Sequence, residues 1–158
     1  MVITEAGNDP KVAGLMYVSA LIPDEGQSVV DVVKAFPPAP GNAEFRQSPS
    51  GFLFLSFKGM DEYFAPDVEA SERKVMYATQ GHWAASSTLQ KIKAPAWKTK
   101  PSWCVVATND QIINPALERA EAKMIKATTI EVDASHVPML SKPEKIAAFI
   151  LSAITTLI

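Results

Sequence analysis

The sequence lacks most features of secreted and membrane-spanning proteins. Cys104 is the only cysteine, so no disulfide can form within the chain and we expect a reducing, cytoplasmic location. Residues 1–5 have neither the cationic start nor the apolar run of a signal peptide. Residues 147–158 are strongly apolar, but they fall short of the roughly 20 residues that cross a bilayer. We therefore expect no membrane partner, and we interpret this segment as a buried helix.

Positive charge is also scarce. The 15 lysine and arginine residues are outnumbered by 17 acidic residues, which gives a formal charge of -2. Such a chain has no basic field to attract phosphates, so nucleic acid is not an expected partner. Two histidines and one cysteine, widely separated, do not suit a structural zinc site. No glycine-rich phosphate loop is present, and we therefore predict neither a metal nor a nucleotide cofactor.

The apolar segments predict one α/β domain over residues 1–158, with a parallel sheet of about three strands flanked by helices. Near-continuous apolar runs over 12–18, 102–108 and 128–132 are typical of strands covered on both faces. Between the last two, Asn114 and Pro115 begin a helix whose apolar stripe is Leu117, Ala120, Met124 and Ile125. This segment predicts a β-α-β unit.

The chain is expected to end in a helix and to carry a cap before the second strand. Ser141 and Glu144 form a capping box, and one helical face follows with Ile146, Phe149, Ile150, Ile154 and Leu157. Residues 24–100 are far too long for an ordinary crossover, so they predict an inserted, mainly helical cap. Its expected pieces are helices over 28–35, 67–80 (begun by Asp67 and stopped at Gly81) and 83–90, with an extended segment at 51–55.

Polar residues follow two successive predicted strands. The strand 102–108 runs into Asp110, and the strand 128–132 runs into His136. Catalytic groups in α/β proteins gather at the carboxyl ends of parallel strands, and a carboxylate can orient an imidazole that accepts and returns a proton. We therefore predict Asp110 and His136 as catalytic residues. The alternatives are a turn or helix-cap role for Asp110 and a structural role for His136.

Several segments in combination resemble bacterial α/β-hydrolases of the esterase type, over essentially the whole chain. They are Thr4-Glu5-Ala6-Gly7, residues 12–18, Pro23-Asp24-Glu25-Gly26-Gln27-Ser28, Pro95-Ala96-Trp97-Lys98, Ser102-Trp103, Ala107-Thr108-Asn109-Asp110 and Asp133-Ala134-Ser135-His136. The resemblance implies the C-terminal half of the α/β-hydrolase sheet, with Asp110 as the acid and His136 as the histidine of a catalytic triad. A small-molecule ester is the implied substrate.

The resemblance also implies a nucleophile that this sequence does not contain. In the family, a Gly-x-Ser-x-Gly-Gly elbow directly precedes the residues that match 2–5, and this chain begins where the elbow ends. Ser28 is a better helix N-cap than a nucleophile, and Ser135, adjacent to His136, is expected to point away from it. We therefore expect a relative of serine carboxylesterases that is inactive alone or needs missing sequence.

The alternative is a binding or assembly module without enzymatic activity. A sheet that lacks its front half leaves the strand at 12–18 as an unpaired edge, which can pair with another chain. We therefore expect a homodimer or other homo-oligomer through the Val12 to Val18 edge.

Overall fold

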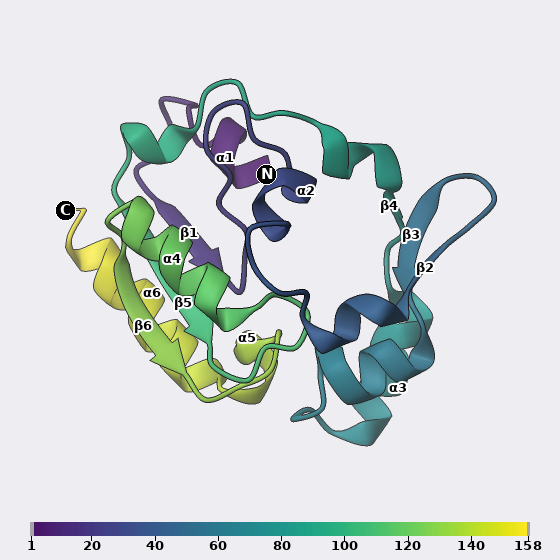
Figure 1. Cartoon of the computed structure of the whole chain (residues 1–158). Helices are drawn as coiled ribbons and strands as arrows, with labels where there is room; N and C mark the ends of the chain where they lie inside the picture. Colours follow the sequence, from purple (N-terminus) through teal and green to yellow (C-terminus); the bar gives the residue numbers. More distant parts are fainter. Residues whose placement is uncertain (1, 158) are drawn as a thin grey trace.

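A parallel three-stranded sheet forms one side of the molecule, and the cap projects from it between the first two strands (Figure 1). The computed structural model describes residues 2–157. The strands β1 (Leu15–Val18), β5 (Ser102–Ala107) and β6 (Thr128–Val132) lie in the order β1-β5-β6. The predicted sheet is therefore confirmed.

The first strand is shorter than predicted, beginning at Leu15 rather than at Val12. The Val12 N–H closes a turn on the Asp9 carbonyl at 3.0 Å, so residue 12 is still in the preceding turn. Gly14 lies so close to the Trp103 ring that a Cβ atom would meet it at 2.6 Å. The glycine thus lets the chain pass the ring just before pairing begins.

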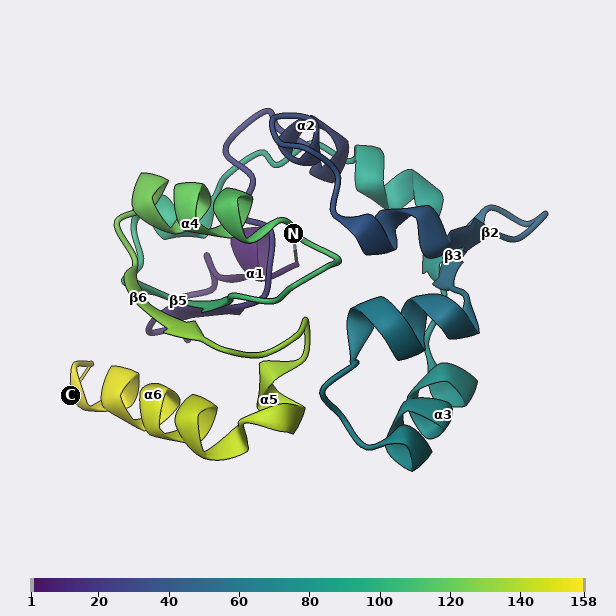
Figure 2. The same ribbon diagram turned by 60° about the horizontal axis from the view of Figure 1, so that its bottom comes forward.

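The strand β5 is buried along its whole length because it lies between two strands and two helical layers. Its residues alternate between the two faces, as the pleat requires. Figure 2 shows α4 (Pro115–Met124) and the short α1 (Val2–Ala6) on one face and α6 (Pro143–Thr155) on the other. The core on the α4 face consists of Leu15, Tyr17, Ile22, Ala96, Cys104, Ala122 and Ile125. The core on the α6 face consists of Trp103, Val105, Val132, Ala134, Ile146, Phe149 and Ala153.

The helix α4 has the predicted start but not the predicted buried face. The Asn114 side chain accepts from the Ala116 N–H, and Pro115 occupies the first turn. Of the predicted stripe, Leu117 and Ile125 are buried, but Ala120 and Met124 are exposed. Glu118 and Glu121 lie on the buried face instead of Ala120 and Met124. Their burial is tolerated because each carboxyl group accepts a hydrogen bond from a buried backbone N–H. The predicted stripe was therefore wrong in half of its members.

The capping box predicted for the last helix is absent. Ser141 is the last residue of a separate short helix, α5 (Pro138–Ser141), and α6 begins at Pro143 without a side-chain cap. The predicted face is also only partly buried, since Ile146 and Phe149 pack on the sheet. The other three predicted members, Ile150, Ile154 and Leu157, are each more than a third exposed. The sheet is too narrow to cover the whole apolar stripe.

The cap, residues 24–100, combines short helices with a small antiparallel sheet of order β2-β3-β4. Ser28 caps its first helix as predicted, by accepting from the Asp31 N–H. In chain order, the elements are α2 (Val29–Val33), η1 (Pro40–Glu44), β2 (Phe45–Gln47), β3 (Phe52–Leu55), η2 (Gly59–Phe64), α3 (Ala70–Thr79), β4 (Trp83–Ala84), η3 (Ala85–Leu89) and η4 (Ala96–Lys98).

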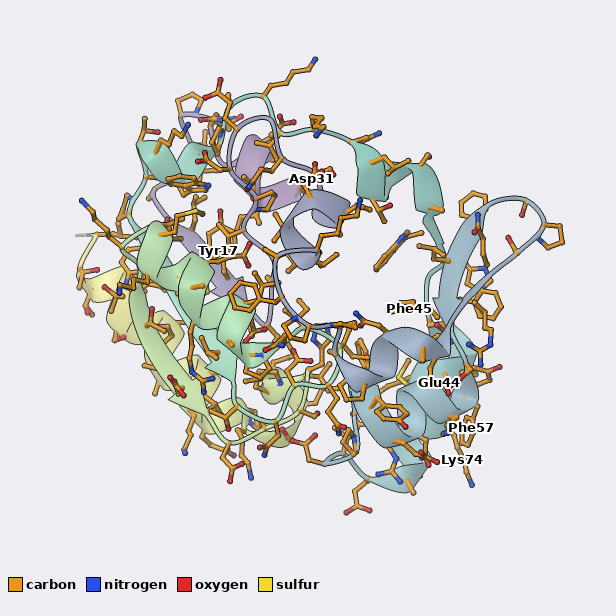
Figure 3. The ribbon with its side chains drawn as sticks, viewed as in Figure 1. Tyr17, Asp31, Glu44, Phe45, Phe57 and Lys74 are labelled. Carbon is orange, nitrogen blue, oxygen red and sulfur yellow. The ribbon has the colours of Figure 1, made fainter. Side chains whose placement is uncertain are left out.

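Two details of the predicted cap are wrong. Asp67 does not begin α3, which runs from Ala70 to Thr79 instead of over the predicted 67–80. Residues 83–90 form the strand β4 and a 3₁₀ turn instead of a third helix, because Trp83 and Ala84 pair with β3. Figure 3 shows Glu44, Phe45 and Phe57 gathered in the cap, away from Tyr17 in the sheet half. No helix within residues 2–157 is long and apolar enough to cross a membrane.

Candidate active site

The structure brings Asp110 and His136 together, as predicted. Both follow the carboxyl ends of adjacent parallel strands, β5 and β6, so the loops that carry them meet at one edge of the sheet. The Asp110 Oδ2 atom and the His136 Nδ1 atom lie 2.6 Å apart. The carboxylate side chain is fully buried, whereas the imidazole is 17% exposed. One edge of the imidazole is thus accessible while its partner is held away from water.

The loop after β5 holds the Asp110 carboxylate in place. Its Oδ1 atom accepts from the N–H groups of Ile112 at 2.7 Å and Ile113 at 3.0 Å, and its own N–H donates to the Ala107 carbonyl at 3.2 Å. Because both amides bind Oδ1, the Oδ2 atom is left to accept a hydrogen bond from His136. Both oxygens of the Asp110 carboxylate therefore have hydrogen-bond partners, and its orientation is fixed.

The cap holds the loop that carries His136. Asp67 accepts from the Ser135 backbone N–H at 2.9 Å and from the Ser135 hydroxyl. Partial burial disfavours the charge of Asp67, but the hydrogen bonds from Ser135 lower the pKa of this carboxyl below its ordinary value. The Phe64 ring packs against the imidazole with 4.8 Å between ring centroids. The contact with Ser135 explains why Asp67 does not cap α3. Local sequence carries no signal for this contact, because the two residues are 68 positions apart.

Two further acidic residues lie buried on α4, below the site. Glu118 Oε2 accepts from the Ala107 N–H at 3.2 Å, and Glu121 Oε1 accepts from the Ile22 N–H at 2.9 Å. Burial raises the pKa of Glu121 to about 7. Burial, followed by the charge of Asp110, raises the pKa of Glu118 well above its ordinary value. Sequence reasoning missed both, although their spacing puts them on the same helical face as Leu117 and Ala122.

The other candidate residues have structural contacts. Ser28 is a helix cap, and Ser135 is buried against Asp67 rather than facing an open site. Burial raises the pKa of the Cys104 thiol to about 12, so the thiolate is scarce at neutral pH. His82 stacks on Phe54 in the cap, with 5.0 Å between ring centroids. Within residues 2–157, no cluster of three or more histidine, cysteine or acidic side chains could hold a metal ion.

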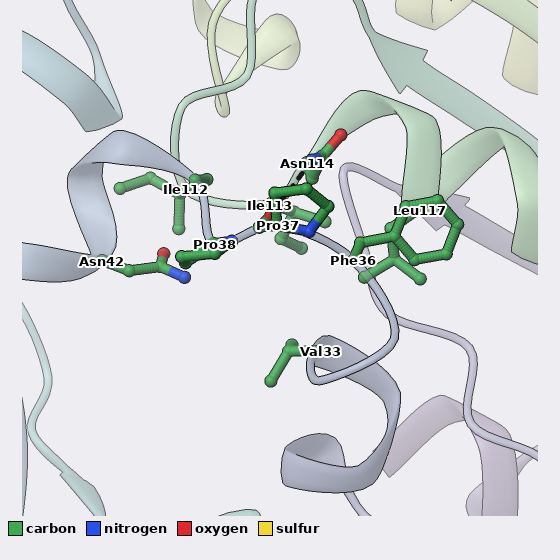
Figure 4. Close-up of a pocket in the computed structure, with 10 residues that line it drawn as sticks. Val33, Phe36, Pro37, Pro38, Asn42, Ile112, Ile113, Asn114 and Leu117 are labelled. Carbon is green, nitrogen blue, oxygen red and sulfur yellow. Dashed lines mark hydrogen bonds between the residues drawn. The ribbon is translucent and has the colours of Figure 1, made fainter.

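Two surface hollows lie beside the site, not over it. The one in Figure 4 is lined by Phe36, Pro37, Ile112, Ile113 and neighbouring residues, so it borders the outer side of the Asp110 loop. The second has a volume of about 180 Å³ and lies between α2 and α4. Neither includes Asp110 or His136 in its lining. The accessible edge of the imidazole therefore faces neither hollow.

The sequence profile described as "Alpha/beta hydrolase family" matches residues 1–149. The chain belongs to the alpha/beta hydrolase family. The three parallel strands and the position of Asp110 and His136 after the last two agree with this assignment. No curated protein matches the chain by sequence.

Solved structures of alpha/beta hydrolases share its fold. Polyneuridine aldehyde esterase superimposes with a TM-score of 0.79 at 14% identity, covering 96% of this chain and 66% of that protein. A pyrethroid hydrolase from Sphingobium faniae JZ-2 superimposes with a TM-score of 0.70 at 20% identity, covering 96% of this chain and 64% of that protein. A variant of tomato methylketone synthase I, complexed with beta-ketoheptanoate, superimposes with a TM-score of 0.73 at 14% identity, covering 98% of this chain and 65% of that protein. At these identities the likeness shows the fold alone. This alpha/beta hydrolase chain spans less than two thirds of the length of each.

Proposed function

We propose that this chain supplies the acid and the histidine of a serine carboxylesterase site, with Asp110 and His136 as the catalytic pair. The observation that carries the proposal is the contact of 2.6 Å between a fully buried carboxylate and a partly exposed imidazole, at the carboxyl edge of an alpha/beta hydrolase sheet. The sequence contains no Gly-x-Ser-x-Gly, so the serine nucleophile would come from residues outside it.

The hydrogen-bond pattern sets the roles of the two ring nitrogens. Asp110 accepts from Nδ1–H, which leaves Nε2 as the basic nitrogen, and Nε2 has no hydrogen bond within the described part of the chain. Nε2 would accept the serine proton while the serine oxygen bonds to the ester carbonyl carbon. It would return that proton to the departing alcohol as the C–O ester bond breaks. Water then repeats the sequence to release the acid.

The cap supports a small, apolar ester as the substrate class. Phe64 from η2 packs against the imidazole, so the surface next to His136 includes an apolar ring. Apolar walls with few polar groups suit the acyl part of an ester. The buried state of Cys104 in β5 is compatible with the cytoplasmic location that we propose for the enzyme.

The test is labelling by a fluorophosphonate probe, which reacts with activated serines. The chain is expressed together with the coding sequence that precedes Met1, and labelling is compared for the unaltered protein, His136→Ala and His82→Ala. We expect one labelled serine, loss of labelling in His136→Ala, and full labelling in the matched His82→Ala control, because His82 contacts only the cap. Equal labelling of the His136→Ala protein would contradict the proposal.

A second candidate function is self-association through β1, and one observation favours it. The Leu15 and Ser19 N–H groups donate towards β5, so the main-chain groups of Met16 and Val18 point outwards from an edge strand. Such an edge can pair with the same edge of a second copy. Light scattering coupled to size-exclusion chromatography should then show a dimer that Met16→Pro converts to a monomer. A monomeric unaltered chain would rule this candidate out.

A further inference from the structure

Residues 135–137, which include the imidazole, lie between the sheet half and the cap. They form no helix or strand. The sheet half holds the chain up to the residue before them, because the Asn109 N–H donates to the Ala134 carbonyl at 3.1 Å. Among the described residues, the only main-chain N–H of 135–137 with a hydrogen-bond partner belongs to Ser135, and the partner is Asp67 in the cap. The main chain beside the imidazole is therefore held from the cap side.

Asp67 binds Ser135 through both of its carboxylate oxygens. Oδ2 accepts from the Ser135 main-chain N–H at 2.9 Å, and Oδ1 accepts from the Ser135 hydroxyl. Ser135 is 2% exposed, so water does not take the place of Asp67 as the acceptor. The two bonds fix both the main chain and the side chain of the residue immediately before His136.

The same segment of the cap, residues 64–68, contacts the imidazole and the residue after it. The Phe64 ring packs on the imidazole, with the two ring planes tilted by 59°. Val137 is buried in an apolar cluster with Ala65 and Val68. Figure 2 shows the loop before α5 on the side of the sheet half that faces the cap. One short cap segment therefore contacts three consecutive residues of the loop that carries the imidazole.

Arg73 on α3 holds the segment that presents Asp67. Its Nη1 atom donates to the carbonyls of Pro66 at 3.0 Å and Val68 at 2.8 Å, the residues on either side of Asp67. Its Nε atom donates to Asp61 at 2.8 Å. The planar guanidinium has its orientation fixed by these three bonds. A continuous series of hydrogen bonds thus runs from α3 to the residue next to the imidazole.

We propose that Asp67 is a positioning residue, which acts through Ser135 to hold the His136 imidazole against Asp110. The role rests on the proposed function of Asp110 and His136. Asp67 does no chemistry itself, because both of its oxygens bind Ser135. Catalytic groups need supporting contacts that hold them within about 0.5 Å of their productive geometry. Asp67 supplies such a contact, and the distance of 2.6 Å between Asp110 and the imidazole depends on it.

The test is the tautomer of the His136 imidazole, which nitrogen-15 NMR reads in this chain without a nucleophile. A His82→Gln background leaves one histidine, since the chain has two. At about pH 8.5, where free histidine is neutral, the contact with Asp110 keeps the proton on Nδ1. An imidazole released into water is free to carry the proton on Nε2 instead. We expect Asp67→Ala to lower the ratio of the Nδ1–H to the Nε2–H tautomer at least tenfold, because Ser135 loses both acceptors.

A conservative variant and a matched control complete the comparison. Asp67→Asn keeps the size of the side chain and one acceptor oxygen, so we expect the ratio to fall about threefold. Glu44→Gln is the control, because Glu44 is a cap carboxylate that accepts from the Ser56 hydroxyl at 2.5 Å and has its partners within the cap. We expect it to keep the parent ratio.

Two NMR results would overturn the proposal. One is an unchanged ratio in Asp67→Ala or Asp67→Asn protein whose dispersed amide signals show that it is folded. The other is an equal fall in Glu44→Gln, since the effect would then belong to the cap in general and not to the contact with Ser135.

Protein that includes the coding sequence upstream of Met1 adds a kinetic measurement. Asp67→Asn should lower kcat for ester hydrolysis about tenfold and leave KM within about twofold, because a displaced imidazole affects the transition state rather than substrate binding. A raised KM with unchanged kcat would overturn the positioning role. If the unaltered protein has no turnover, the proposed function fails, and the tautomer ratio still decides the role of Asp67. The two proposals therefore fail separately.

Discussion

Replacing Glu121 by glutamine should change how the stability of the fold depends on pH. The Glu121 carboxyl is 5% exposed, its Oε1 accepts from the Ile22 N–H, and its Oε2 is buried with no partner within the described residues. A charge there has one hydrogen bond to compensate for its loss of water. Burial therefore raises the pKa of Glu121 from 4.5 to about 7.

The sign and size of the effect follow from proton linkage. The folded chain holds the Glu121 proton more tightly than the unfolded chain does, so the free energy of unfolding falls as pH rises from about 4.5 to about 7. Each pKa unit corresponds to about 1.4 kcal/mol. The shift from 4.5 to about 7 therefore removes roughly 3 kcal/mol from the free energy of unfolding once the pH is above 7. Glu121→Gln has no proton to lose. Its stability relative to the unaltered chain should therefore improve by roughly 3 kcal/mol between pH 4.5 and pH 8.

Urea unfolding at several pH values measures this difference directly. Glu118 is present in both proteins, and the charge of Glu121 is the smallest of the influences on its pKa, so most of the Glu118 contribution cancels in the comparison. Glu72→Gln is the matched control, because Glu72 lies on the exposed surface of α3 and should give no pH-dependent difference. A stability difference between Glu121→Gln and the unaltered chain that stays constant from pH 4.5 to pH 8 would contradict the raised pKa of Glu121.

Three other outcomes are expected. In protein that contains the nucleophile, Asp110→Asn should reduce kcat for ester hydrolysis by about 10⁴-fold, because the imidazole loses the carboxylate that orients it; unchanged kcat would contradict its role. Asp67→Asn should weaken the contact with Ser135 and cost about 1 kcal/mol in urea unfolding at neutral pH. Because the folded chain lowers the pKa of Asp67, this difference should shrink as the pH falls below the ordinary range of a carboxyl group; equal stability at pH 7 would contradict this. Cys104 should react with a thiol reagent at pH 8 only when the chain unfolds, and rapid labelling of folded protein would contradict its burial.

The main elements of the fold could be predicted because each has a strong local signal. The apolar runs in β5 and β6 are long enough to indicate strands that are covered on both faces. Asn114 and Pro115 mark the start of α4 by cap chemistry that depends only on neighbouring residues. The contact between Asp110 and His136 could be predicted for the same reason, since both directly follow adjacent parallel strands.

The errors occur where a residue takes its partner from a distant part of the chain. Asp67 has the sequence features of a helix cap, but Ser135 provides a better pair of donors. Ser141 has the spacing of a capping box, but the short helix α5 includes it and leaves its hydroxyl away from the start of α6. The predicted buried face of α4 omits Glu118 and Glu121, because acidic side chains are rarely buried without partners. Their partners are the backbone N–H groups of Ala107 and Ile22, which local sequence cannot reveal.

The proposed role of Asp110 and His136 as the acid and base of an ester-hydrolysing site is tested by kcat/KM for a p-nitrophenyl ester with a short acyl chain. The protein for this assay is the chain produced together with the coding sequence upstream of Met1. We expect turnover that falls at least a thousandfold in His136→Ala and stays within about twofold in His82→Ala. Turnover that persists unchanged in His136→Ala would contradict it.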